Sequence, residues 1–580
     1  MNWDLNNLYE SIDDPNIKKD KDLVTRQTKA FTKKYKGKIA SKKSTGKLVR
    51  NALCEYEQII ERLYWLVYYA NFLHSKDTKS TSIGKFYQNI EEFYTNIASD
   101  LVWFKLEITK SKISIEEYSY FLEQTRREKP YLLSEKEEFI LTKKTQTSSD
   151  AFNRFFDEKQ SQLTFEIEID KKVKTINSSE LDAILKRHPE RRLRKKATLI
   201  AAEKYKDNSH FYTFVLNTLL LDKQITDNLR KHKFAQEATY LNYDVDKKTV
   251  DTMTDSVVNN YPLVERYYRK KAKILNLARL HEWDRYSYIK QSGIKYSWSE
   301  AKEIILSSFY GFDEQFGKIA REFFENGWID AITTKNRRDG AYCSYLTPLK
   351  HPYIFMNFTG GLDDIMTLAH ELGHGIHAFL SRENCMLHFF PSTATAEIAS
   401  TFAESLVFDE LYKNSNSSDF KINLLAEKIQ SSFATVFRQT AFHLFESDIH
   451  EHRRTNGELS TEEFGKYYQK RLQDSFGKGL NLTKDHKFFW MPILHFYHYN
   501  FYVFSYAFGE LLAMSLFDLY KREKKNFVKK YIDILKMGGS ASPKDILKAI
   551  DQDITKENFW QNGMNLLENY IDEFEKLPSR

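Results

Sequence analysis

The sequence predicts a mostly α-helical protein, and three observations support this fold class. Only 20 Gly and 10 Pro occur among 580 residues, so the residues that interrupt helices are scarce. Hydrophobic residues make up 41% of the chain and aromatic residues 15%, which is enough to bury a large core. Long segments also repeat apolar residues at intervals of three and four, the spacing of one helix face. A chain of this length is too long for one simple domain.

Two long helices are predicted near the N-terminus, on either side of the polar segment 75–82. The helical spacing occurs first at Tyr56, Ile60, Leu63, Val67 and Ala70, and then at Ile83, Tyr87, Ile90, Tyr94, Ile97 and Leu101. A short connection between two amphipathic helices favours an antiparallel pair. We expect the tyrosines of this pair to pack in its core.

A short β-hairpin is predicted next, because the apolar period changes to two. Leu163, Phe165, Ile167 and Ile169 alternate with polar residues before a turn at 170–172. Helical patterns resume at Ser179. We therefore divide the chain into an N-terminal helical domain, residues 1–180, and a larger domain, residues 181–580.

A second β-rich segment lies at residues 339–361, "DGAYCSYLTPLKHPYIFMNFTGG". Asp339 and Gly340 begin it as a turn, and Gly360 and Gly361 end it just before a long helical pattern. Two short strands are predicted between them, forming a small sheet beside that helix. The sheet is either structural or an edge on which an extended peptide pairs.

Charge and composition argue against a nucleic-acid binder. Lys+Arg 87 against Asp+Glu 80 gives a net charge of only +7 on a large surface. The one dense basic run, Arg191–Lys196, lies in an amphipathic pattern and is interpreted as a solvated helix face. We expect no nucleic-acid partner.

Cysteine usage and the apolar segments predict a cytoplasmic location. The three cysteines are odd in number and far apart, so no disulfide framework is implied. The first residues, "MNWDLNNLYESIDD", do not resemble a signal peptide. The most apolar long segment, residues 501–520, is interrupted by Glu510 and is not a membrane span.

The segment "HELGHGIH", beginning at residue 370, predicts a metal site. On a helix, His370 and His374 project from one face, one turn apart, and can share a zinc ion. Glu371 is then placed to accept a proton from a zinc-activated water rather than to bind the metal. The alternative is a packing helix with incidental polar residues.

A catalytic zinc needs a third protein ligand. Metzincins take it from a His six residues after the second one, and Leu380 occupies that position here. The segment 392–412 instead places Glu397, Ser400 and Glu404 on one helix face. We predict Glu397 as the third ligand and place Glu404 behind the ligands, with a surface role as its alternative. His377 either approaches the site or packs in the core.

These motifs resemble those of the M3 family of zinc metallopeptidases, and in particular its oligoendopeptidase F branch. The resemblance rests on "TLAHELGHGIHAFL", "TAEIASTFAE", residues 340–361, "HFYHYNFYVFSYAFG" and "GGSASPKDILKAI", and it covers nearly the whole chain. It implies a two-lobed helical metallopeptidase with a deep central cleft and one catalytic zinc, bound by the three predicted ligands. It also implies internal cleavage of short, unstructured peptides.

The same resemblance assigns substrate contacts to the aromatic segment 495–506. It implies His495 and Tyr502 as catalytic donors to the substrate carbonyl. The implied substrate-binding residues are Tyr497, Tyr499 and Tyr506, and His377 is added as a substrate-binding candidate because its helix face can approach the site. Phe504 stands where relatives often have Tyr, so the hydroxyl that stabilises the oxyanion is left open. The alternative for this segment is an aromatic core helix.

Two other functions compete with peptide hydrolysis. One is a zinc protein that holds peptides without cutting them, which the presence of Glu371 argues against. The other is the nucleic-acid binder that the scattered charge disfavours. The cleavage preference, the physiological peptide and the oligomeric state stay open, with a monomer favoured.

Overall fold

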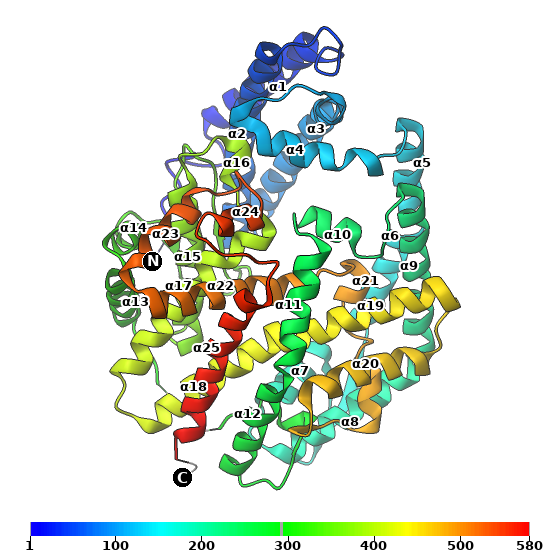
Figure 1. The fold of residues 1–580 in the computed structure, drawn as a ribbon, viewed down its shortest axis with the longest axis vertical. Coiled ribbons are helices and arrows are strands. Elements are labelled where there is room, and N and C mark those ends of the chain that lie inside the picture. Colours follow the sequence, from blue (N-terminus) through cyan, green and yellow to red (C-terminus); the bar gives the residue numbers. More distant parts are fainter. Residues whose placement is uncertain (1, 290–293, 579–580) are drawn as a thin grey trace. The chain divides into compact units, whose positions relative to one another are not determined.

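The computed structural model describes residues 2–289 and 294–578, and it is mostly helical, as predicted. Figure 1 shows the helices coloured along the sequence. The chain forms two compact units, each assembled from three segments. Unit 1 comprises Met1–Lys129, Ile294–Asn414 and Leu519–Asp553, and unit 2 comprises Pro130–Gly293, Ser415–Asp518 and Ile554–Arg580.

Unit 1 contains long helices and one small sheet. Its elements are α1 (Pro15–Tyr35), α2 (Gly46–Lys76), α3 (Thr81–Lys110), η1 (Glu116–Tyr118), α4 (Ser119–Arg127), α13 (Trp298–Phe312), α14 (Glu314–Glu325), β4 (Ile329–Asp330), β5 (Tyr342–Ser344), β6 (Tyr353–Phe355), α15 (Leu362–Ser381), α16 (Met386–Phe389), α17 (Thr393–Asn414), α23 (Lys525–Lys536) and α24 (Pro543–Lys548).

Unit 2 is also mainly helical. After η2 (Lys129–Tyr131), its elements are α5 (Glu135–Thr145), α6 (Ser149–Ser161), β1 (Thr164–Ile169), β2 (Lys172–Asn177), α7 (Ser178–Arg187), α8 (Arg191–Asp207), α9 (Ser209–Arg230), α10 (Glu237–Asn242), α11 (Lys247–Asn259), α12 (Tyr261–Ile274), β3 (Leu280–His281), η3 (Glu282–Asp284), α18 (Ser418–Ser432), the π-helix η4 (Phe433–Phe437), α19 (Arg438–Asn456), α20 (Thr461–Phe476), β7 (Leu480–Asn481), η5 (Lys484–Phe488), α21 (His495–His498), α22 (Phe504–Glu523) and α25 (Glu557–Lys576). The last residues of α22 belong to unit 1.

The predicted helical pair near the N-terminus is confirmed as α2 and α3, which pack against each other and against α1. The hydroxyl of Thr45 caps the start of α2, and that of Ser80 caps the start of α3. Their facing sides bury Leu63 and Ile97, as the spacing predicted. Tyr56 and Tyr94 pack against this core rather than at its centre.

The predicted β-hairpin is confirmed as β1 and β2, which pair antiparallel with Ile169 opposite Lys172. The two residues between the strands, Asp170 and Lys171, both have positive φ. This geometry is that of a tight two-residue hairpin turn. Phe165 and Ile167 are buried, so the apolar residues of the alternating pattern lie on the core-facing side of the hairpin, as predicted.

The small sheet beside the helix of the HELGHGIH segment is also confirmed. Its strand order is β4-β6-β5, with β6 parallel to β4 and antiparallel to β5. Both β5 and β6 contact α15, the helix that carries His370 and His374. The sheet therefore supports the predicted metal site directly.

The basic run Arg191–Lys196 lies on a helix, as predicted, and its Arg192 and Lys195 are exposed, but Arg191 and Arg194 depart from the predicted solvated face. It lies in α8, but Arg194 is only 4% exposed and its Nε donates to the Trp283 carbonyl at 2.8 Å. Arg191 donates twice to Asp284, at 2.8 Å each time. Because Asp284 is remote in sequence, the local pattern did not reveal that Arg191 and Arg194 pair with its buried carboxylate.

Within residues 2–289 and 294–578, no helix has both the length and the apolar character that crossing a membrane requires. This finding agrees with the interpretation of residues 501–520. These residues span the end of the aromatic segment and most of α22, whose side chains from Ala507 to Phe517 are mainly buried in the protein itself.

Candidate active site

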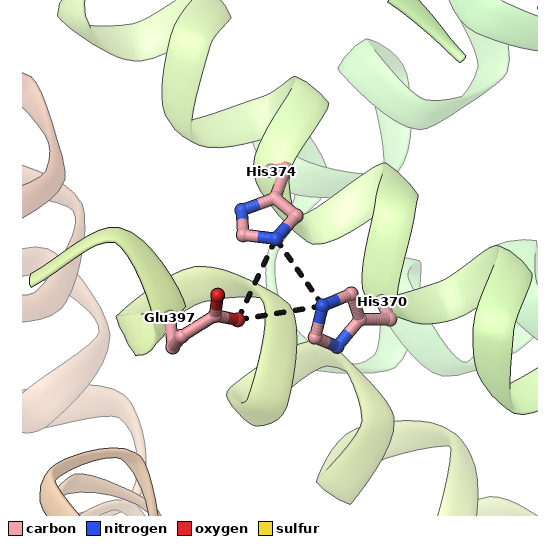
Figure 2. A group of neighbouring side chains, drawn as sticks. All are labelled: His370, His374 and Glu397. Atoms are coloured by element: carbon pink, nitrogen blue, oxygen red, sulfur yellow. Dashed lines mark hydrogen bonds and ion pairs between the residues drawn. The ribbon is translucent and has the colours of Figure 1, made fainter. Parts of the chain in front are cut away.

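The histidines of α15 and a glutamate of α17 converge within unit 1. His370, His374 and Glu397 point their polar atoms toward one another (Figure 2). The Nε2 atoms of the two histidines are 3.2 Å apart. The Oε2 atom of Glu397 lies 3.3 Å from Nε2 of His370 and 3.5 Å from Nε2 of His374.

These three distances fit a tetrahedral zinc ion. Ligand atoms about 2.0–2.1 Å from zinc, at tetrahedral angles, lie roughly 3.3–3.4 Å from one another. The three ligand atoms in the structure form a triangle of nearly this size, because each pair of them is separated by 3.2–3.5 Å. Two imidazoles and one carboxylate also form a common donor set for a catalytic zinc, which keeps a fourth position open.

Side chains behind the ligands fix their orientation. Nδ1 of His370 is 2.6 Å from Oε1 of Glu404, so the Nε2 atom is the one left for a metal. The Ser400 hydroxyl donates to Oε2 of Glu397 at 2.7 Å. Burial disfavours the charged imidazole, but the carboxylates of Glu404, Glu397 and Glu371 together outweigh this effect and raise the pKa of His370 to about 10. Glu404 therefore contacts the ring nitrogen of His370 that is not directed at His374 and Glu397.

Glu371 is 6% exposed and lies on α15 next to His370. Burial raises the pKa of its carboxyl to about 7, although the backbone N–H of Cys343 donates to it and acts in the opposite sense. That N–H belongs to β5, so the small sheet orients the carboxylate. A carboxyl with a pKa near neutrality suits general-base chemistry.

His377 and Tyr345 lie next to the histidine pair. His377 is 2% exposed, and burial lowers the pKa of its imidazole to about 3, which favours the packing alternative. The ring of Tyr345 lies 6.3 Å from that of His374 and 6.1 Å from that of His377. The Tyr345 hydroxyl is buried without a hydrogen-bond partner among the described residues. The sequence analysis did not select Tyr345, although the strand beside the metal helix pointed to its segment.

Gly373 allows α15 and α17 to approach closely enough for Glu397 to reach the histidines. A Cβ atom at Gly373 would lie 2.6 Å from Cα of Ser400 and still closer to the Ala399 carbonyl. These are backbone atoms, so no side-chain rotation relieves the overlap. The glycine within the HELGHGIH segment is therefore required by helix packing.

We predict that Gly373→Ala lowers the free energy of unfolding by about 1–3 kcal/mol and weakens zinc binding, because the two helices must separate. Urea unfolding and zinc titration against a chelating dye measure both effects. Gly311→Ala in α13 is the matched control, since a Cβ there meets no atom within 4 Å. It should be neutral or stabilising. Equal stability and zinc affinity in both variants would contradict the packing argument.

The aromatic segment forms a cluster around His495 in unit 2. The Tyr506 hydroxyl lies 3.2 Å from Nε2 of His495, and the ring of Tyr502 stacks on the imidazole at 6.0 Å between centroids. Tyr499 contacts both His495 and Tyr502 and is 54% exposed. Burial, and then the charge of Arg438, lower the pKa of His495 below its usual value. The structure thus brings four of the predicted residues together.

Tyr497 is not part of this cluster. It is 2% exposed and stacks on Phe156 at 3.9 Å, and its hydroxyl has no hydrogen-bond partner among the described residues. Phe504 is fully buried against Tyr240 and Tyr243. The segment is not one helix: α21 ends at His498, and α22 begins at Phe504. Because the helix is interrupted between them, the side chain of Tyr497 packs on Phe156, whereas that of Tyr502 packs on His495.

Glu446 of α19 holds the turn between α21 and α22. Its Oε1 accepts the N–H of Phe501 at 2.8 Å, and Phe501 has a φ of 60°, which is uncommon for a residue with a large side chain. Glu446 is 1% exposed, and burial raises the pKa of its carboxyl to about 8. The folded protein therefore favours the protonated form of the Glu446 carboxyl at neutral pH.

We predict that Glu446→Gln becomes increasingly stabilising, relative to the wild type, as the pH rises from 5 to 8. Below about pH 4.3, the pKa of a Glu carboxyl in the unfolded chain, the carboxyl is protonated in the folded and the unfolded protein, so its pKa shift does not affect stability. Above it, only the unfolded chain ionises freely, so the wild type loses stability until the folded pKa of about 8. Thermal unfolding at pH 5, 6, 7 and 8 measures this, with the exposed Glu451→Gln as control. A pH-independent difference would refute it.

The fold and the site define a helical metallopeptidase. Residues 184–566 match peptidase family M3, and residues 107–165 match the family described as Oligopeptidase F. The chain is 30% identical to Oligopeptidase PepF of Bacillus subtilis over 94% of its own length and 82% of that protein. The chain belongs to peptidase family M3, in its oligopeptidase F branch.

Solved structures show the same fold. A structure from Chlamydophila abortus superposes with a TM-score of 0.88 at 25% identity, covering 100% of this chain and 98% of that one. Oligoendopeptidase-F from Enterococcus faecium superposes with a TM-score of 0.71 at 22% identity, covering 97% and 98%. The predicted family and fold class are thereby confirmed.

Proposed function

We propose that this metallopeptidase hydrolyses internal bonds of short, unstructured peptides and uses one zinc ion held by His370, His374 and Glu397. The observation that carries the proposal is the triangle of their ligand atoms, with sides of 3.2–3.5 Å, in a chain of family M3. The name Oligopeptidase PepF, printed for the Bacillus subtilis relative, supports peptides as substrates.

Glu371 acts as the general base in this proposal. When bound, zinc supplies a Lewis acid that polarises the substrate carbonyl and acidifies a water molecule. Glu371 accepts the proton of the attacking water and returns it to the leaving amine. Its burial and the N–H donated by Cys343 hold the carboxylate in one orientation for both transfers. The residue is not a ligand, so its replacement separates catalysis from metal binding.

His495 and Tyr502 are proposed as donors to the oxyanion of the tetrahedral intermediate, with Tyr499 and Tyr506 as substrate contacts. Their mutual contacts support a shared task. Tyr506 is a second candidate for the hydroxyl, because its Oη lies beside the imidazole. Tyr497 remains a substrate-binding candidate from the family resemblance and His377 from its helix face, and the burial of both side chains argues for packing roles.

Replacing His495 with Ala should lower kcat by about 100-fold or more while KM changes little, because the proposed hydrogen bond strengthens in the transition state. Tyr502→Phe should act in the same direction with a smaller effect. Steady-state kinetics on one fluorogenic peptide measures both, with the exposed His210→Ala as control. If both active-site variants kept the wild-type kcat, the segment would be core packing only.

The direct test of the proposed function is a mixed peptide library incubated with the purified protein, with and without a chelator, and analysed by mass spectrometry. Internal cuts that disappear with the chelator and return with zinc are expected. A native globular protein and unfolded casein are included, and cleavage should be confined to short peptides. Rapid digestion of casein would redefine the protein as a general protease, and no metal-dependent cut would refute the proposal.

The domain boundary and the location are further proposals. Separate family matches on 107–165 and 184–566 support the division into residues 1–180 and 181–580. The cytoplasm is proposed because Cys54, Cys343 and Cys385 are all free thiols, as expected in a reducing compartment. A monomer is proposed as the working form, which sedimentation analysis tests.

A further inference from the structure

Unit 2 contains a cavity of about 650 Å³ that includes His495 in its lining. Ligand sites in proteins typically have volumes of about 300–1,000 Å³. Two arginines line it: Arg285, directly after η3, and Arg438, the first residue of α19. Aromatic side chains, among them Tyr286 and Tyr468, form part of its wall. Arg438 follows the π-helix η4, a distortion that often occurs at functional sites.

Neither arginine of the cavity has a carboxylate partner. Among the described residues, no Asp or Glu oxygen lies within 4.0 Å of the guanidinium nitrogens of Arg285 or Arg438. The Nε–H of each arginine is buried and has no hydrogen-bond acceptor in the described chain. Arg438 donates from Nη1 to the Tyr286 hydroxyl at 2.5 Å. The buried Nε atoms are out of a ligand's reach, but Nη1 and Nη2 of Arg285 and Nη2 of Arg438 make no hydrogen bond within the described chain, so these atoms retain donors for another group.

The acidic groups of the cavity are occupied by other residues. Asp182 forms an ion pair with Lys186 at 2.7 Å. Glu282 is in contact with His486 and accepts the Thr483 hydroxyl at 2.5 Å. Neither carboxylate therefore pairs directly with an arginine of the cavity, although the charge of Glu282 acts on Arg285 from a greater distance.

Buried contacts hold Arg285 in place from behind. Lys271 is fully buried, and its Nζ donates to the Arg285 carbonyl at 2.8 Å. Arg194 donates to the carbonyl of Trp283 at 2.8 Å, and Asp284 is bound by Arg191. The backbone that presents Arg285 is therefore preorganised, which reduces the entropy lost when a ligand binds.

We propose that this cavity binds a carboxylate of the peptide substrate, at its C-terminus or on an Asp or Glu side chain. Guanidinium groups recognise carboxylates through paired hydrogen bonds, and here two of them lie in a partly buried site without a carboxylate partner among the described residues. The inference rests on the proposed function, because His495 connects the cavity with the reacting peptide only if it contacts substrate. It implies that substrates with a negative charge at this position bind more tightly.

The test uses three fluorogenic peptides that share one scissile bond. The first ends in a free carboxylate, the second in an amide, and the third in an amide with Glu as the last residue. Wild-type kcat/KM is measured for each, and equilibrium Kd is measured by calorimetry in the Glu371→Gln protein. For at least one carboxylate peptide, kcat/KM should be about tenfold or more higher, and Kd about tenfold or more lower, than for the neutral peptide. The peptide that does so identifies the source of the carboxylate.

Variants then assign the preference to the cavity. Arg438→Gln and Arg285→Gln should each bring the ratio between carboxylate and neutral peptides toward one, and Arg438→Lys should lower it partially. Arg154→Gln, which removes an exposed arginine of α6, should leave the ratio unchanged. Circular dichroism checks that each variant is folded. Should Arg285→Gln fail to fold, the ratio measured with Arg438→Gln alone decides the test.

A wild-type protein without carboxylate preference would overturn the inference, whether or not the variants fold. Preserved ratios in both folded arginine variants would also overturn it. Metal-dependent cleavage of the neutral peptide in either case shows that the proposed function stands and that only the carboxylate site fails. If none of the peptides is cut, the proposed function fails, and the Kd ratio still reports on the cavity.

Discussion

Glu371→Gln is expected to lower kcat/KM by about 100- to 10,000-fold while the protein keeps a full equivalent of zinc. An amide occupies the same space and its oxygen can still accept the Cys343 N–H, but it cannot accept a proton from water. The His370, His374 and Glu397 group is unchanged in this variant. Fluorogenic peptide kinetics and metal analysis of the same sample measure the two properties.

Glu383→Gln is the matched control for this replacement, because Glu383 is exposed just beyond the end of α15. It should retain both activity and zinc. If Glu371→Gln kept near-wild-type turnover, Glu371 would not be the base. If it lost zinc together with activity, the carboxylate would have a structural role at the metal site.

Glu397→Ala is expected to weaken zinc binding by more than about 100-fold, because it removes one of three protein ligands. The Ser400 hydroxyl also loses its carboxylate partner. Competition with a chelator of known affinity measures the change, and activity should fall in parallel at limiting zinc. Glu404→Ala, which removes only the group behind His370, should weaken binding by about 10- to 100-fold.

Glu410→Ala on the same helix is the control for both losses. Glu410 accepts a hydrogen bond from Ser307 at 2.8 Å and one from Asn414 at 3.0 Å, and it belongs to no metal group among the described residues. Its replacement should leave zinc affinity unchanged. Wild-type affinity in Glu397→Ala would show that the third ligand lies elsewhere, and an effect of Glu404→Ala equal to that of Glu397→Ala would reverse their assigned roles.

The local parts of the site were predictable because they depend on spacing within one helix. His370 and His374 share a face of α15 for geometric reasons that hold for any helix. The helical pair α2–α3 and the β1–β2 hairpin were predicted from apolar periods of the same local kind. The order of Glu397, Ser400 and Glu404 along one face of α17 likewise follows from sequence alone.

Relations between segments were less predictable. The basic run of α8 was interpreted as solvated, whereas Arg194 is buried beside Asp284 because residues far away in sequence pack against it. Tyr497 and Tyr502 were grouped together, but the turn with positive φ at Phe501 directs them to different surroundings. A turn of this kind leaves no periodic signal in an aromatic segment.

The sequence by itself determined the helical class, the family and the pair of histidines with its adjacent glutamate, since each is recorded in residue type and local spacing. Only the tertiary structure decided that Glu397 reaches both histidines, that Glu404 stands behind His370, and that Arg285 and Arg438 share a cavity with His495. These contacts depend on how closely helices pack, as the absence of a side chain at Gly373 illustrates. Such distances arise from the packing of the whole core, so no single segment of the sequence specifies them.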